Sequence, residues 1–537
     1  MTSPTHAQLR TRFVNEENRR WWTLAAMCFA LFMIMLDNTV VNVALPSIQK
    51  DLDASISGLE WTVNAYTLSF AVLLVTGGRL GDIFGRRRMF LFGVVTFGLS
   101  SGFIGLSQSD AWLVTGRAIQ GIGAAFMMPA TLSIITNAFP PEERGKAIGT
   151  WAGVSAMALA IGPVVGGFLV ENVSWQSIFF LNLPVAVAAV AVTLFATHES
   201  RDETAPPSID YAGVGTLTIG LGALVLALVE GNAWGWGSGR IIGLLAAAVV
   251  GLVAFVVIEA RIANPMVDFK FFRSRSFAGA NVVAFVVSFA MLATFFFFAL
   301  YLQNIHHYSP LQTGVRFLPT TGVIIVVGPI AGRLSDRIGP RPLMTLGLVL
   351  TAISLFWQGH VAADTSYGFL VGAFVLMGLG MGLIMSPMST AAMNAVDPTK
   401  AGVASGVLSM SRMVGGTFGV AAMGALITTL GRHKIDELLP QVPDATRHDL
   451  AANLGAGGAT SGGPAAVHSA VEQAFLYALN DGLRIAAVVC AIGAVAAWLL
   501  VAPGVPHRQP VHDAASSEAG TGDAGAELGA AAETVLA

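Results

Sequence analysis

The stretch GRLGDIFGRRR at residues 78–88 recurs as GRLSDRIGPRP at residues 332–342. Each copy follows an apolar segment that is the second in a block of six. The loop PPEERGKAIG at 140–149 has a looser echo in DPTKAGVASG at 397–406, after the fourth segment of each block. Two six-helix halves related by such a repeat are typical of membrane transporters.

The composition predicts an all-α membrane protein. Of 537 residues, 54% are hydrophobic and 11% are charged, whereas soluble domains carry roughly 25% charged residues. Long uncharged runs recur, each able to cross a hydrocarbon core about 30 Å thick. We expect fourteen spans, at about 22–43, 61–79, 88–107, 112–138, 147–170, 177–197, 211–229, 239–258, 277–302, 312–332, 342–360, 366–390, 401–430 and 482–501.

The basic residues predict the orientation. An even number of spans puts both termini on one side, and loops rich in Lys and Arg stay in the cytoplasm. With both termini inside, only five of the 29 basic residues fall in outer segments: Lys50, Arg240, Arg432, Lys434 and Arg447. We therefore expect a multi-pass protein of the cytoplasmic (inner) membrane with both termini cytoplasmic. The first span is not read as a cleaved signal peptide, because a charged leader precedes it and no small-residue cleavage site follows.

The repeat also predicts the organisation of the chain. We expect a cytoplasmic leader, an N-terminal six-helix bundle, an inserted helix pair with its linkers, a C-terminal six-helix bundle and a disordered cytoplasmic tail. Their ranges are 1–20, 21–200, 201–275, 276–503 and 504–537. Within the second bundle, residues 431–480 are rich in Ala, Gly and polar residues and predict a long outer loop, with a short surface helix near Phe475.

Five motifs occur in order on the expected helices: LDNTVVNVALP at 36–46, the repeated loop motif, RAIQGIGAA at 117–125, GPVVGG at 162–167 and SRMVGGTFG at 411–419. In them the chain resembles the major facilitator superfamily, and within it the 14-helix drug:proton antiporters of the EmrB/QacA type. The likeness covers roughly residues 20–430 and 475–500. It implies the major facilitator fold, with two six-helix bundles plus two inserted central helices, and export of antibiotics or other lipophilic compounds driven by protons.

Asp37 is the strongest candidate for proton coupling. It lies inside the first span, and acidic residues in spans are costly and usually face a cavity or a partner. A desolvated carboxylate can load and release a proton. Arg117 lies in the fourth span at a similar depth, and Gln120 is one turn away. The resemblance makes these helices neighbours and associates Arg117 with proton coupling. The alternatives are a structural Asp near a helix end and an Arg that satisfies backbone carbonyls.

The repeated motif predicts a conformational latch made of Gly78, Asp82, Gly85, Arg86 and, in the second copy, Asp336. The glycines permit a tight turn between close-packed helices. Asp82 can approach a helix N-terminus of the opposite half, where the macrodipole favours negative charge. In the second copy Pro340 and Pro342 replace Arg86 and Arg88, which predicts a weaker latch. Positive charge that only sets the topology is the alternative.

Gly162, Pro163, Gly166 and Gly167 interrupt the fifth span. Proline bends a helix and glycines let another helix approach closely. By resemblance this is the antiporter motif of the fifth helix, although Ala158 stands where the family often has a further glycine. Ordinary packing of small residues is the alternative.

Arg316 and Arg412 are expected within spans ten and thirteen, so together with Arg117 they outnumber Asp37. Some relatives that expel divalent cations place extra carboxylates in the later helices, and this chain has none there. The sequence therefore favours neutral, zwitterionic or anionic amphiphiles as substrates. The candidate cavity residues are Asn38, Asn42, Trp61, Tyr66, Met127, Trp151, Phe289 and Arg412.

The sequence carries no GxxxxGK[ST] loop, so an ion gradient rather than ATP should supply the energy. We expect no cofactor besides the coupling proton, no metal site, no catalytic constellation and no nucleic-acid partner. The partners are a lipophilic small molecule and membrane lipid, and an accessory envelope protein is left open. The rival functions are a proton-coupled carrier of a small nutrient or metabolite on the same fold, and a non-transporting membrane scaffold or sensor.

Overall fold

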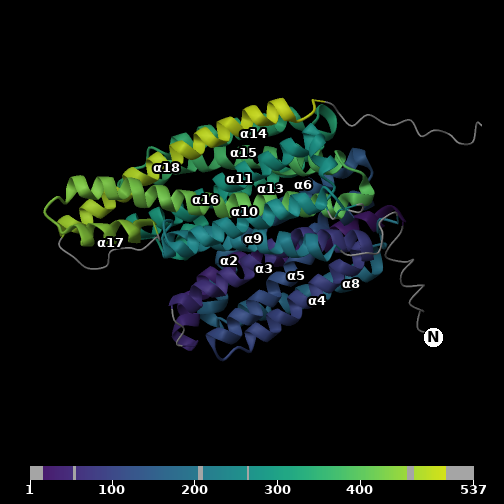
Figure 1. The fold of residues 1–537 in the computed structure, drawn as a ribbon, viewed down its shortest axis with the longest axis horizontal. Helices are drawn as coiled ribbons and strands as arrows, with labels where there is room; N and C mark the ends of the chain where they lie inside the picture. Colours follow the sequence, from purple (N-terminus) through teal and green to yellow (C-terminus); the bar gives the residue numbers. More distant parts are fainter. Residues whose placement is uncertain are drawn as a thin grey trace, which may run out of the picture. The chain divides into compact units, whose positions relative to one another are not determined.

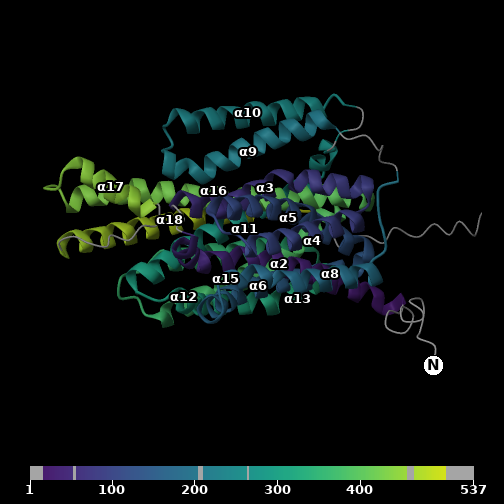
Figure 2. The ribbon, with the colours of Figure 1, turned by 90° about the horizontal axis from the view of Figure 1, so that it is seen from below.

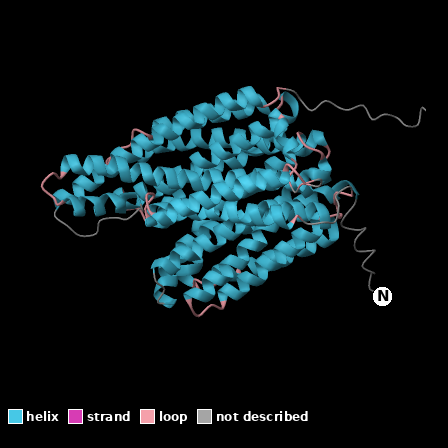
Figure 3. Cartoon of the chain, in the orientation of Figure 1, coloured by secondary structure: helices cyan, strands magenta, loops and turns pink. Residues whose placement is uncertain are grey.

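The computed structural model describes residues 16–52, 56–203, 210–262, 265, 267–455 and 465–503, and within these ranges every regular element is a helix (Figure 3). The first part of the chain forms α2 (Glu16–Leu52), α3 (Ile56–Phe84), α4 (Arg86–Gly105), α5 (Asp110–Ala138), α6 (Pro141–Asn172), α7 (Ser177–Phe180) and α8 (Asn182–Ala196). The middle forms α9 (Tyr211–Trp234), α10 (Gly239–Glu259) and the short 3₁₀ helix η1 (Phe269–Arg273).

The last part of the chain forms α11 (Arg275–Leu300), the π-helical turn η2 (Tyr301–Ile305), α12 (Pro310–Arg316), α13 (Leu318–Ile338), α14 (Pro340–Gln358), α15 (Tyr367–Asn394), η3 (Pro398–Lys400), α16 (Ala401–Leu438), α17 (Asp444–Gly455) and α18 (Ala465–Leu500). Helices α2 to α8 pack on one another, as do α11 to α18 (Figures 1 and 2). The two groups are called the N-bundle and the C-bundle below.

Local sequence explains where several helices begin. The hydroxyl groups of Ser109, Ser238 and Ser274 accept hydrogen bonds from the first free amides of α5, α10 and α11. In both copies of the repeated motif a glycine separates two consecutive helices. Gly85 has φ 110° and Gly339 has φ 84°, so each supplies the left-handed residue that separates two long helices.

The described residues include thirteen helical segments that are long and apolar enough to cross a membrane. α6 is not one of the thirteen, but it has 32 residues and packs against both α2 and α13. With α6 the helices agree with the expected all-α membrane fold of about fourteen spans.

The inserted pair α9 and α10 lies along the seam between the bundles and does not separate them. α9 packs against α3 of the N-bundle and α16 of the C-bundle, and α3 and α16 also touch each other directly. Figure 2 shows α9 and α10 at one side of the other helices.

The bundles meet closely where the two Arg-rich loops at Gly85 and Gly339 lie, which we call the Arg-rich end. A Cβ atom on Gly78 would collide with the backbone of Gly402, and one on Gly332 with the backbone of Gly145. Ser405 Oγ donates to the Pro129 carbonyl at 2.6 Å, across the same seam. These contacts close the bundles against each other at the Arg-rich end.

Helices occupy more of residues 431–480 than the sequence predicted, and the placements of Phe475 and Arg316 are wrong. Residues 431–438 and 465–480, expected in an outer loop, continue the helices α16 and α18, with α17 packed between their ends. Phe475 is buried in α18 rather than in a surface helix. Arg316 ends the short helix α12 and precedes the candidate span Leu318–Ile338, so it is not within a span. The expected tail 504–537 and leader residues 1–15 lie outside the described residues.

Candidate functional site

The centre of the N-bundle contains a buried ion pair. Asp37 lies in α2 and Arg117 lies near the start of α5, and Arg117 Nη1 donates to Asp37 Oδ2 at 2.5 Å. The two side chains are 2% and 1% exposed, respectively. Removing one partner of such a pair leaves an uncompensated charge in a medium of low dielectric constant, which typically costs about 3–5 kcal/mol.

Amide and hydroxyl groups complete the surroundings of Asp37. Gln120 Nε2 and Asn182 Nδ2 donate to Asp37 Oδ1 at 2.9 and 3.3 Å. The same two nitrogens donate to Ser101 Oγ at 2.8 and 3.2 Å. The carboxylate therefore accepts from three side chains of α5 and α8.

Arg117 is held from its other sides as well. Its Nε donates to the Thr62 carbonyl of α3 at 3.0 Å, and its Nη1 donates to Gln120 Oε1 at 2.6 Å. The guanidinium carbon lies 4.2 Å from the ring centroid of Tyr66, which is a cation–π geometry. Arg117 is therefore held by α3 and α5 in addition to its counter-ion on α2.

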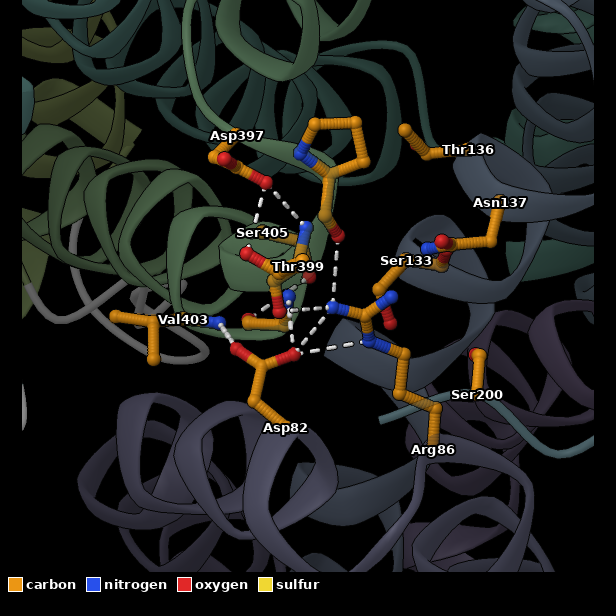
Figure 4. A network of polar contacts seen from close by, with 12 residues as sticks. Asp82, Arg86, Ser133, Thr136, Asn137, Ser200, Asp397, Thr399, Val403 and Ser405 are labelled. Atoms are coloured by element: carbon orange, nitrogen blue, oxygen red, sulfur yellow. Dashed lines mark hydrogen bonds and ion pairs between the residues drawn. The ribbon is translucent and has the colours of Figure 1, made fainter. Parts of the chain in front are cut away.

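A second buried ion pair joins the bundles at the Arg-rich end (Figure 4). Asp82, at the end of α3, accepts from the Gly402 and Val403 amides at the start of α16, at 2.9 and 2.8 Å. A carboxylate at a helix N-terminus is stabilised by the free amides and by the macrodipole. Asp82 is fully buried, so this contact fixes α3 to α16.

Arg86 holds Asp82 from the other side and also reaches the C-bundle. Its Nη2 lies 2.6 Å from Asp82 Oδ1 and donates to the Pro398 and Thr399 carbonyls at 2.9 and 2.6 Å (Figure 4). The Thr399 amide and hydroxyl hold the pKa of the Asp397 carboxyl below its usual value. These contacts join the start of α4 in the N-bundle to η3 in the C-bundle.

Glu199 and Asp268 support the same region. The carboxylate of Glu199 accepts from the Arg87 and Arg88 amides at 3.0 and 3.2 Å and so caps α4. Lys400 Nζ donates to Asp268 at 3.0 Å. Partial burial raises the pKa of Asp268, but hydrogen bonds from the Lys270 amide and the Lys400 ammonium outweigh it, and the net pKa is below the usual value.

The second copy of the motif makes a similar but sparser contact. Asp336 of α13 accepts from the Gly145 amide of α6 at 3.2 Å. No described arginine forms an ion pair with Asp336, in contrast to Arg86 beside Asp82. The sequence predicted this difference from the prolines at 340 and 342.

The glycine motif of α6 faces α2. A Cβ on Gly162 would collide with the Thr39 side chain, and one on Gly166 would press on Val40 at 3.0 Å. Thr39 and Val40 follow Asp37 by two and three residues. A Cβ on Gly167 would meet nothing within 4 Å, so this glycine does not face a helix in this state. α6 continues as a helix through Pro163.

We expect Gly162→Val to destabilise the protein and to reduce transport strongly, whereas Gly167→Val should be tolerated. The added atoms at position 162 force α2 and α6 apart beside Asp37, and overpacking of this kind costs about 1–3 kcal/mol. Thermal unfolding of the purified variants, together with drug efflux, measures the difference. Equal behaviour of the two variants would contradict a role for close packing of α2 on α6.

Some of the remaining cavity candidates contact the Asp37 network, and others pack inside one bundle. Tyr66 belongs to the Asp37 network, and Asn38 donates to the Ile34 carbonyl of its own helix. Met127 packs on Gly93 of α4, and Phe289 packs on Gly419 of α16, so both lie inside their own bundles. Trp151 is buried and Trp61 is partly exposed. The side chain of Asn42 is not among those described.

The sequence reasoning missed several members of both networks. Ser101, Asn182 and Thr62 around Asp37 went unmarked, as did Glu199 and Asp397 near the latch. Asn182 carried the only usable signal, because it is an amide at the start of an otherwise apolar span.

Fold and site together define a multi-pass membrane transporter built from two six-helix bundles, with a buried charge pair in one of them. A family profile described as Major Facilitator Superfamily matches residues 27–420. The chain belongs to this superfamily.

The relatives are resistance and export proteins by name. The chain is 39% identical to the tetracenomycin C resistance and export protein of Streptomyces glaucescens, over 76% of each chain. It is 38% identical to the multidrug resistance protein Stp of Mycobacterium tuberculosis H37Rv, over 80% of each chain. It is also 38% identical to the puromycin resistance protein pur8 of Streptomyces alboniger, over 76% of this chain and 82% of that protein.

Solved structures share the fold at low sequence identity. The human organic anion transporter MFSD10 aligns with a TM-score of 0.57 at 14% identity, covering 89% of this chain and all of that one. The proton:xylose symporter XylE aligns with a TM-score of 0.59 at 12% identity, covering 91% of this chain and 97% of that one. At these identities the likeness concerns the fold alone.

Proposed function

We propose that this protein exports antibiotics or other lipophilic small molecules across the cytoplasmic membrane in exchange for protons. The observation that carries the proposal is the Asp37–Arg117 pair, buried in a membrane-spanning bundle at 2.5 Å. Intramembrane ion pairs of this kind mark proton and substrate pathways. The names of the relatives support the drug class, since they include resistance proteins for tetracenomycin C and puromycin.

The exchange follows from the two ion pairs. In the state seen here, Asp82 and Arg86 hold the bundles together at the Arg-rich end. We assign this end, together with both termini, to the cytoplasm on the basis of the positive-inside rule. A proton that reaches Asp37 from outside removes the counter-charge of Arg117, loosens the contacts among α2, α5 and α8, and favours the alternate state. In that state the proton leaves to the cytoplasm, the pair forms again and substrate binds from the cytoplasm. Return to the state seen here then releases the substrate to the outside.

The protein should need no cofactor, metal or ATP for this cycle, and its partners are its substrate and membrane lipid. The expected division at residues 200 and 275 stands as the proposed division into two bundles and an inserted pair. Gly162, Gly166 and the neighbouring residues of α6 serve as the packing surface for the Asp37 segment of α2.

Efflux from energised cells tests the proposal. Cells that express the protein are loaded with ethidium, puromycin or tetracenomycin C, and export is followed before and after a protonophore is added. We expect export that stops with the protonophore and continues when ATP alone is depleted. Export of no compound, combined with proton-driven uptake of a small nutrient, would move the function to a nutrient carrier.

A further inference from the structure

Arg412 of α16 has no counter-ion among the described residues. It lies within the candidate span Pro398–Leu438, and its Nη2 donates to Met385 Sδ at 3.8 Å. A thioether is a weak acceptor, and no carboxylate oxygen of the described residues lies within 4.0 Å of its guanidinium. Arg117, by contrast, has its own acid, Asp37.

Among the helices that pack on α16, α11 and α15 contain no Asp or Glu. Asp82 of α3 and Asp481 of α18 are paired with Arg86 and Arg484, and Glu230 of α9 accepts from Asn64. The acids of α16 itself are Asp436 and Glu437, at least 24 residues further along the helix. At 1.5 Å per residue this is about 36 Å away.

The position of Arg412 on α16 directs it toward the N-bundle. Arg412 follows Ser405 by seven residues, two helical turns, so the two share a face. Ser405 on that face bonds the Pro129 carbonyl of α5. Arg412 therefore lies about 10 Å beyond the contact that closes the Arg-rich end.

The helical rise per residue also gives the depth of Arg412 relative to the ion pair of the N-bundle. Arg117 precedes Pro129 by twelve residues on α5, which is about 18 Å along that helix. Arg412 is thus at a depth between the closed end and the Asp37–Arg117 pair.

Methionine side chains lie beside Arg412. Met385 of α15 contacts its guanidinium, and Met410 and Met413 are close to it along α16. Methionine side chains fit ligands of varied shape. A charged guanidinium is costly in such surroundings unless an anion joins it.

We propose that Arg412 binds the acidic group of the transported molecule, and that the preferred substrates are lipophilic compounds with a carboxylate or a comparably acidic group. The proposal rests on the export function above. The guanidinium presents paired donors that match a carboxylate, while the methionines contact the apolar body. The missing counter-ion of Arg412 is then the substrate itself.

Two dyes with the same xanthene body test this: rhodamine B, which carries a free carboxylate, and its ethyl ester, which does not. Binding to the purified protein in detergent is measured by fluorescence polarisation. We expect wild type to bind the acid about tenfold or more tightly than the ester, as suits a charge-assisted hydrogen bond. Arg412→Met should lose this preference and keep its affinity for the ester, and Arg412→Lys should restore part of it.

Arg240→Met, which removes an exposed arginine on α10, is the matched control and should bind like wild type. Arg412→Met should unfold at the same temperature as wild type or higher, because it removes an unpaired charge from apolar surroundings, whereas a structural arginine would lower that temperature. The proposal is overturned if wild type binds both dyes equally or if Arg412→Met keeps the preference. It is also overturned if phosphatidylglycerol displaces the acid dye from wild type and not from Arg412→Met, which would assign Arg412 to a lipid headgroup. Binding needs no gradient, so failure of this inference is distinguishable from a failure of proton-driven export.

Discussion

Asp37→Asn should lower proton-driven efflux to the level of cells that lack the transporter. Asparagine has nearly the same shape and keeps one oxygen for Gln120 and Asn182, but it cannot exchange a proton and does not neutralise Arg117. The variant is thereby held in the charge state that wild type reaches only after proton uptake. Efflux in energised cells, with a protonophore as reference, measures the loss.

A second assay separates lost coupling from lost folding. In proteoliposomes without a gradient, the purified Asp37→Asn protein should still exchange labelled drug for unlabelled drug, because exchange requires substrate binding and movement but no net proton transfer. Asp51→Asn, on the same helix but in its exposed last turn, is the control and should pump like wild type. Full efflux by Asp37→Asn would place proton coupling at another residue.

Asp82→Asn should open the contact between the bundles at the Arg-rich end. The substitution weakens the bonds to the Gly402 and Val403 amides and leaves Arg86 buried without its acid, and breaking a buried pair typically costs about 3–5 kcal/mol. A free energy of this size is enough to change which conformation dominates, since about 5.5 kcal/mol takes a two-state ratio from 1:99 to 99:1. We expect distances between spin labels on the α3 and α16 ends to lengthen, and drug efflux to fall.

Asp336→Asn is the matched control for this experiment, because Asp336 occupies the corresponding place in the second copy but has no arginine partner among the described residues. Its label distances should change less, and its efflux should fall less. An equal effect of the two substitutions would mean that the amide contact alone holds the bundles, and that Arg86 contributes only positive charge.

Much of the fold was predictable because the two halves of the chain carry copies of the same motif. The motif at 78–88 and its copy at 332–342 place a glycine of positive φ between two helices in each half, and hydropathy locates the helices on either side. Asp37 and Arg117 were predictable as a pair from their depth in neighbouring helices, since charges are rare in spans.

The other features of the fold and site depend on tertiary contacts that cannot be read from the composition of the sequence. Ser101 and Asn182 are small polar residues in apolar runs, and such residues commonly bond only to their own helix. Residues 431–480 are rich in Ala and Gly and resemble a loop, yet burial of Ile435, Leu454 and Phe475 keeps α16, α17 and α18 together. Arg316 was assigned to a span because hydropathy does not show that Tyr308 and Tyr367 hold its guanidinium at 3.5 and 5.4 Å from their ring centroids.

The continuous helix α16 runs without a proline from the latch at Gly402 to Leu438, beside the packed helices α17 and α18. At 1.5 Å per residue its 38 residues span about 57 Å. A long rigid helix amplifies a small rotation at one end. A tilt of only ten degrees about Gly402 would displace the distal end of α16 by roughly 10 Å. A fluorophore pair that measures the distance from this distal end to the outer end of the N-bundle would then follow each transport cycle in a single molecule.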